Sequence, residues 1–131
     1  MTKQMQILKI ATISGVLVLG ACTNANIEAA QKLDIRGTDA RSEAAREYKR
    51  LAYFEDKVMW DKASAIAFSE KALAAAHGRL STETTLDQNA AEPTPAEIAD
   101  AYQTLNRMLA AGADQIAPKA TGQALARLDC W

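Results

Sequence analysis

The apolar positions of the chain form one short run near the N-terminus, broken only by Thr12, Ser14 and Gly15, and several periodic stretches further along. The run covers residues 10–19, which is shorter than the about 20 apolar residues that a membrane-spanning helix needs. Lys3 and Lys9 precede the apolar residues, and no acidic residue occurs before Glu28. A basic start, a short apolar segment and small residues after it are typical of a secretory signal peptide. We therefore expect residues 1–21 to be an export signal.

From residue 39 onward, apolar residues recur at spacings of three and four, alanine dominates, and no β-branched alternating run occurs. This pattern predicts helices. The first should cover residues 39–59. Asp61 should begin the second by accepting a hydrogen bond from a free amide, and His77-Gly78 should end it with a left-handed residue. The residues predicted to face inward are Ala44, Tyr48, Leu51, Ala52 and Val58 in the first helix, and Ala63, Ile66, Ala67, Leu73 and Ala74 in the second.

A second pair of helices follows the polar loop of residues 79–93. Thr94-Pro95-Ala96-Glu97 has the pattern of a capping box, with Thr at the N-cap, Pro at the first helical position and Glu at the third. Pro118 should separate the third helix from a short fourth one. The inward residues are predicted to be Ile98, Tyr102, Leu105, Leu109, Gly112 and Ile116, and then Ala124, Leu125, Leu128 and Trp131.

The fold class predicted from these patterns is all-α, a small alanine-rich bundle of about four helices in two antiparallel hairpins. The folded domain should cover residues 39–131. Because many inward positions are alanine, little apolar area is available for burial, and we expect modest stability.

The signal peptide ends in Leu19-Gly20-Ala21-Cys22, which resembles the lipobox of bacterial lipoproteins. The resemblance implies that Leu19, Gly20 and Ala21 are recognised by a signal peptidase and that cleavage follows Ala21. It also implies a diacylglycerol on the Cys22 sulfur and an acyl chain, such as palmitate, on the new amino group. Two or more lipid chains anchor a protein stably. Thr23, rather than Asp, follows the cysteine, which favours the outer membrane over the inner membrane.

Residues 23–38 are polar and show little periodicity, so we expect them to be a flexible tether. A frayed helix at residues 28–33 is an alternative for part of this segment. Sixteen flexible residues span ~20–25 Å on average. The expected organisation is therefore a signal peptide at 1–21, a lipidated N-terminus and tether at 22–38, and a helical periplasmic domain at 39–131.

The charges and the reactive side chains argue against several functions. Without Lys3 and Lys9 the 15 basic residues fall to 13 against 16 acidic ones, so the mature part carries a formal charge of −3. It has no basic stripe of the kind that binds nucleic acid. Cys130 and His77 are the only cysteine and histidine after Cys22, and no neighbour in the sequence activates the thiol. We therefore expect neither an enzyme, nor a metal site, nor any cofactor other than the covalent lipid.

Four stretches in the same order resemble the N-terminal periplasmic region of alphaproteobacterial OmpA-family lipoproteins. They are EYKRLAYFEDKVMWDKASAIAFSEKALAAAHG, a proline-containing loop, LAAGADQIAP and ALARLDCW, and the resemblance covers roughly residues 40–131. In that family the helical region is followed by further helix, another cysteine and a peptidoglycan-binding domain. The present chain stops at Trp131, so peptidoglycan binding is not carried over. The resemblance implies that Cys130 is half of a disulfide whose partner was lost by truncation or lies on another molecule; otherwise it is a free thiol.

The predicted function is that of a non-enzymatic, lipid-anchored cell-envelope protein facing the periplasm, a helical spacer or interaction module. The alternative is an adaptor or pilotin-like lipoprotein that binds a peptide of an envelope complex between its helices. The expected partners are a membrane, reached through the lipid on Cys22, and an envelope protein, with a disulfide partner for Cys130.

Overall fold

The computed structural model describes residues 25–80 and 95–130 of the chain. These residues form helices, and no strand occurs in the described ranges. Residues 25–31 are helical. The subsequent elements are α2 (Ala40–Phe54), the π-helix η1 (Glu55–Met59), α3 (Lys62–Ala76), α4 (Ala96–Ala110), α5 (Ala113–Ile116) and α6 (Pro118–Leu128).

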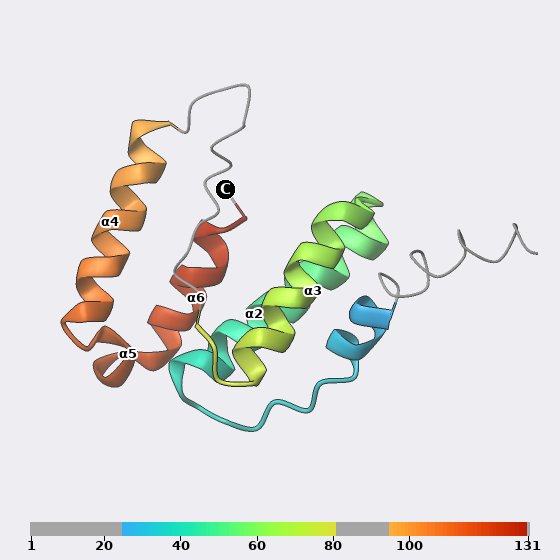
Figure 1. Ribbon diagram of the computed structural model, residues 1–131, viewed down its shortest axis with the longest axis horizontal. Coiled ribbons are helices and arrows are strands. Elements are labelled where there is room, and N and C mark those ends of the chain that lie inside the picture. The colour runs from blue at the N-terminus through green and yellow to red at the C-terminus, as the bar shows by residue number, and fades with distance from the viewer. Residues whose placement is uncertain (1–24, 81–94, 131) are drawn as a thin grey trace, which may run out of the picture.

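The helices form two antiparallel hairpins, as the sequence predicts. In Figure 1, α3 returns alongside α2, while α4 and α6 form the second hairpin with α5 at its turn. α2 is the central element because it packs against both α3 and α6, and α4 contacts only α5 and α6 extensively among the described elements. The fold is therefore an all-α bundle in which α6 attaches the second hairpin to the first.

The side chains and backbone atoms that define the helix ends explain these boundaries. Asp61 accepts hydrogen bonds from the amides of Ala63 and Ser64, as expected for the start of α3. His77 is the C-cap of that helix, and Gly78 comes next with a φ of +85°. Pro118 occupies the first turn of α6. The sequence predicted these three boundaries correctly.

The core is rich in alanine, which lets α2 and its neighbours approach closely. Ten buried residues make up the cluster, and seven of them are alanines. α2 and α6 approach closely at Gly122, where a Cβ would lie 2.5 Å from the carbonyl oxygen of Ala40 and 2.7 Å from the amide nitrogen of Ala44. The cluster consists of Ala30, Ala44, Ala45, Tyr48, Leu51, Ala52, Phe68, Ala72, Ala75 and Ala126.

The expected flexible tether at residues 23–38 is wrong for residues 25–35, and the alternative of a helix at residues 28–33 is correct for residues 28–31. Residues 25–31 are helical, Ile27 and Ala30 are buried, and Leu33 and Ile35 pack against the core. The side chain of Lys49 donates a hydrogen bond to the carbonyl of Leu33 at 2.9 Å. The helical body therefore begins no later than residue 25.

Several predicted inward-facing residues point outward instead. Val58 is exposed because the π-helix η1 carries more residues per turn than an α-helix, so α-helical spacing fails there and Asp56 is buried instead. Ile116 is exposed because α4 ends at Ala110, before the left-handed Gly112. Ala63, Ala67 and Ala124 are exposed as well, and the buried face of α3 comprises Ala65, Phe68, Ser69, Ala72 and Ala75.

The predicted capping box is described only in part. Pro95, predicted at the first helical position, is instead the N-cap of α4 and makes no side-chain cap, so Glu97 is the second helical residue rather than the third. Thr94, Trp131 and most of the loop predicted at residues 79–93 lie outside the described ranges.

Candidate functional site

The residues of the lipobox, Leu19, Gly20, Ala21 and Cys22, lie outside the described part of the chain. The helical body, by contrast, is described from residue 25 onward, so only Thr23 and Asn24 separate it from Cys22. Three residue steps extend at most roughly 10 Å. A lipid on Cys22 would therefore hold the first helix close to the membrane.

An exposed apolar surface lies at the turn of the first hairpin, and we name it the apolar tip. Trp60 is 78% exposed and has a φ of +59°, so it occupies the left-handed region that favours glycine. Asp56, below the tip, is buried and pairs with Lys57 and Lys62. Hydrogen bonds from the two lysines lower the pKa of Asp56. The apolar tip consists of Tyr53, Phe54, Val58, Met59 and Trp60.

A groove of about 480 Å³ runs from the apolar tip along α2, and we name it the basic groove. Two hydrogen bonds join α2 to the N-terminal segment at this groove. Gln31 donates to the carbonyl of Lys49, and the side chain of Lys49 donates to the carbonyl of Leu33. No carboxylate is among the described residues that line it. The lining residues are Gln31, Leu33, Ile35, Arg46, Lys49, Arg50 and Tyr53.

The basic residues of this groove differ in how fully they are neutralised. Arg46 pairs with Glu43 at 2.6 Å. Arg50 shares the carboxylate of Glu47 with Arg127, so two guanidinium groups are neutralised by one acid. The ammonium of Lys49 forms no ion pair with any carboxylate of the described residues. The groove therefore carries an excess of positive charge.

A polar cluster around Asp129 joins four helices near the end of α6. Tyr48 from α2 donates to Asp129, and the ammonium of Lys71 from α3 lies 2.6 Å from the same carboxylate oxygen. The hydroxyl of Tyr102 from α4 lies 3.1 Å from the other oxygen and 3.0 Å from the carbonyl oxygen of Leu128. The side chain of Asp129 is only 8% exposed. We interpret this cluster, the Asp129 junction, as a structural connection between the two hairpins.

The Asp129 junction predicts a loss of stability at high pH. Burial and the neighbouring Asp129 raise the pKa of Tyr48 above its ordinary value of 10, and the same causes raise the pKa of Tyr102. The folded protein then holds these protons more tightly than the unfolded chain. The resulting stability is complete below about pH 10 and is lost as the pH rises further. At about pH 11 the loss at Tyr48 should be on the order of 1 kcal/mol.

Urea unfolding at about pH 8 and about pH 11 measures this loss, and Tyr48→Phe is the matched control. The variant should lose less stability between the two pH values than the unaltered chain. Equal losses in the two proteins would show that Tyr48 does not hold its proton in this way.

Cys130 and His77 are not joined into a catalytic pair. Cys130 is a free, exposed cysteine one residue beyond Asp129, and His77 is exposed at the C-terminal end of α3. No hydrogen bond between them is found in the described residues. Within the same ranges, no group of three or more His, Cys, Asp or Glu side chains is placed to hold a metal ion.

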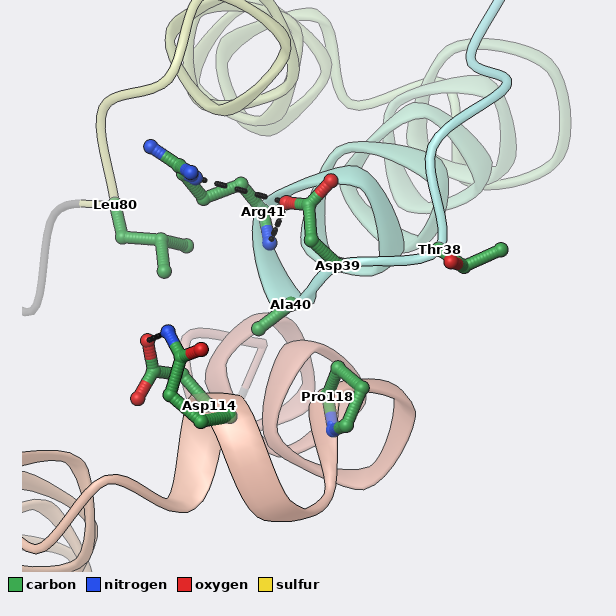
Figure 2. A pocket seen from close by; sticks show the side chains of 8 residues that line it. Thr38, Asp39, Ala40, Arg41, Leu80, Asp114 and Pro118 are labelled. Atoms are coloured by element: carbon green, nitrogen blue, oxygen red, sulfur yellow. Dashed lines mark hydrogen bonds and ion pairs between the residues drawn. The ribbon is translucent and has the colours of Figure 1, made fainter.

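Two further hollows occur on the surface. Figure 2 shows the smaller one, of about 250 Å³, where Asp39 makes an ion pair with Arg41 and caps α2. The hydrogen bond from Ser42 lowers the pKa of Asp39. This carboxylate therefore stabilises the start of α2. The larger hollow, of about 510 Å³, lies between α4 and α6 and is lined by Glu97, Asp100, Ala101, Thr104, Leu105, Met108, Ala124 and Leu128.

Sequence reasoning missed the basic groove, the Asp129 junction and the unusual backbone of Trp60. The spacing of Arg46 and Arg50 predicts ordinary ion pairs with Glu43 and Glu47, and the structure contains both pairs. Nothing in the sequence indicated that the segment after residue 25 would fold onto the same face. The spacing of Arg46, Lys49, Arg50 and Tyr53 on one side of a helix was the available signal.

None of the described helices has the length and apolar character needed to cross a membrane. No protein-family model, no curated protein and no solved structure matches the chain.

Proposed function

We propose that this chain is a lipid-anchored, non-enzymatic protein of the bacterial cell envelope, attached through Cys22 to the outer membrane and facing the periplasm. Its helical body would serve as a spacer or interaction module. The observation that carries the proposal is Leu19-Gly20-Ala21-Cys22 directly after a basic start and a short apolar run. This order of residues supports both export and lipid attachment.

The start of the folded body is compatible with such an anchor. Ile27 and Ala30 are buried, so helical packing begins a few residues after Cys22. A cut after Ala21 would leave these packed residues in the mature protein. The resemblance to OmpA-family lipoproteins supports the same location. Under that proposal Cys130 is half of a disulfide whose partner was lost by truncation or lies on another molecule, or it is a free thiol.

The replacement Cys22→Ser should abolish the attachment. Bacteria producing the chain are labelled with palmitate and fractionated by detergent phase separation. We expect label and detergent-phase partitioning in the unaltered chain and neither in Cys22→Ser, because serine lacks the thiol that forms the thioether. Cys130→Ser is the matched control and should retain both. Label that persists in Cys22→Ser would disprove the anchor.

An adaptor or pilotin-like function is the second candidate, and the hollow between α4 and α6 favours it. Met108 is 53% exposed at this hollow, and Leu105 and Leu128 add apolar surface. A peptide of an envelope complex could place apolar side chains there, as helix-in-groove recognition does. Such a peptide should be retained by the unaltered body and lost with Met108→Asp. A spacer would show no difference between the two.

A further inference from the structure

The apolar tip combines exposure with an unfavourable backbone conformation. Trp60 buries little surface in the folded chain and adopts a left-handed φ that glycine or asparagine would adopt more easily. Trp60 is the C-cap of η1, so the left-handed backbone ends that helix, but the side chain is not buried by the described residues. An aromatic side chain held outward in this way is therefore best explained by a contact outside the described chain.

The basic groove makes this surface continuous with the N-terminal segment. Tyr53 belongs both to the apolar tip and to the groove, while Gln31 and Leu33 line the groove from the other side. In Figure 1 the helix of residues 25–31, in blue, and the turn between α2 and α3 both lie on the side of the view away from α4. The described residues 25–35 therefore lie on the same side of the bundle as the tip.

The charges on this surface indicate what it can contact. Lys49 has no carboxylate partner among the described residues, and Arg50 shares Glu47 with Arg127. Glu55 and Asp61 are close to the tip in the sequence, but neither lines the groove. Their negative charges therefore do not offset the positive excess of the groove. A surface with an exposed tryptophan, further apolar side chains and adjacent cations fits the interface of an anionic bilayer.

We propose that the apolar tip and the basic groove dock on the headgroup region of the anionic phospholipid bilayer that holds the lipid of Cys22. This inference rests on the proposed anchor. Cys22 is three residue steps from residue 25, a reach of at most roughly 10 Å, so a lipid on Cys22 would keep the body at the bilayer. Trp60 then inserts at the interface, while Lys49 and Arg50 face phosphate groups. A lipid anchor raises the local concentration of the surface, so weak contacts are sufficient for docking.

Tryptophan fluorescence in vesicles tests the docking. The lipidated full chain with Trp131→Phe, in which Trp60 is the sole tryptophan, is reconstituted into phosphatidylethanolamine–phosphatidylglycerol vesicles. Some vesicles contain lipids brominated at shallow acyl carbons. Docking predicts emission at a shorter wavelength than that of the unlipidated chain in detergent-free buffer, and quenching by the brominated lipids. Emission that brominated lipids do not quench would overturn the docking: without a shift Trp60 faces water, and with a shift it contacts protein.

Two variants separate docking from folding. Trp60→Gly suits the left-handed backbone, so it should not lower the thermal midpoint. Because this variant lacks the Trp60 fluorophore, its readout is the protection from a soluble maleimide of a cysteine placed by Tyr53→Cys, in chains that also carry Cys130→Ser to remove the exposed thiol at position 130. Protection should be lost in Trp60→Gly and kept in Ile116→Ser, which removes a comparably exposed apolar side chain, 82% exposed, from the other hairpin. Equal protection in both variants would contradict a role for Trp60.

A double variant tests whether the basic groove prefers anionic lipids. Lys49→Gln with Arg50→Gln should reduce Trp60 quenching in vesicles containing phosphatidylglycerol toward the level in vesicles of phosphatidylcholine alone. No reduction would show that the basic groove does not contact the bilayer.

The mass of the reconstituted protein distinguishes the two proposals. An acylated chain whose Trp60 is not quenched disproves the docking and leaves the anchor in place. A chain without acyl groups disproves the anchor, and the docking that depends on it falls with it.

Discussion

Replacing Gly122 with alanine is expected to destabilise the fold. At an exposed helical position the same replacement ordinarily increases stability. A Cβ at this position would meet the carbonyl oxygen of Ala40 and the amide nitrogen of Ala44, and both are backbone atoms that side-chain rotation cannot move. Overpacking of this kind costs about 1–3 kcal/mol. A loss of about 1 kcal/mol lowers the Tm of a domain of this size by ~4–8 °C.

The exposed Ala124 of the same helix supplies the comparison. Ala124→Gly should lose about 0.5–1 kcal/mol, because glycine is the poorer helix former there. Alanine should therefore be the more stable residue at position 124 and the less stable one at position 122, as measured by urea unfolding followed by circular dichroism. A higher stability for Gly122→Ala would mean that α2 and α6 do not cross as closely as described.

Removing the carboxylate of Asp129 is expected to have an effect of similar or greater size. Asp129→Ala leaves the ammonium of Lys71 and the hydroxyl of Tyr48 without their acceptor in a cluster that is largely shielded from water. Breaking a buried ion pair costs about 3–5 kcal/mol in general; because the side chain of Lys71 is 30% exposed, we expect about 2–4 kcal/mol. Urea unfolding measures the difference directly.

Two controls connect this loss to the unpaired charge. Lys71→Met in addition to Asp129→Ala should recover part of the loss, since no ammonium is then left without a partner. Asp100→Ala removes an exposed carboxylate from α4 and should change stability by less than about 0.5 kcal/mol. If Asp129→Ala behaves like Asp100→Ala, the Asp129 junction does not hold the two hairpins together.

The parts of the fold that the sequence predicted correctly are those specified by local chemistry. Asp61 can satisfy free amides only at a helix start, Gly78 favours a left-handed end, and Pro118 fits a first helical turn. None of these features depends on distant residues. The all-α class and the pairing of helices into two hairpins follow from the same local signals together with short turns.

The prediction failed where the choice depends on tertiary packing. Alanines surround α3 on most sides, so the hydrophobic pattern does not distinguish the face with Ala65 and Ala72 from the face with Ala63 and Ala67. Residues 25–35 have the composition of a tether because only a few apolar residues anchor them to the core. The position of residues 25–35 in the fold depends on their packing against α2 and α3.

The surface formed by the apolar tip and the basic groove also depends on tertiary packing. Its charges and aromatics are visible in the sequence, but the basic groove exists only because the N-terminal segment lies along α2 and contacts Lys49. The same segment shortens the expected distance between lipid and body. The sequence suggests a domain held away from the lipid by a tether. In the structure the helical body instead begins close to the proposed anchor.

The central claim is that Cys22 carries the lipid and begins the mature chain. The most direct test is the mass of the N-terminal tryptic peptide from protein extracted with detergent from its native membrane. Trypsin cleaves after Lys32, so we predict a peptide of residues 22–32 bearing a diacylglycerol and an additional acyl chain. An unmodified peptide that continues through residue 21, such as residues 10–32, would contradict the account.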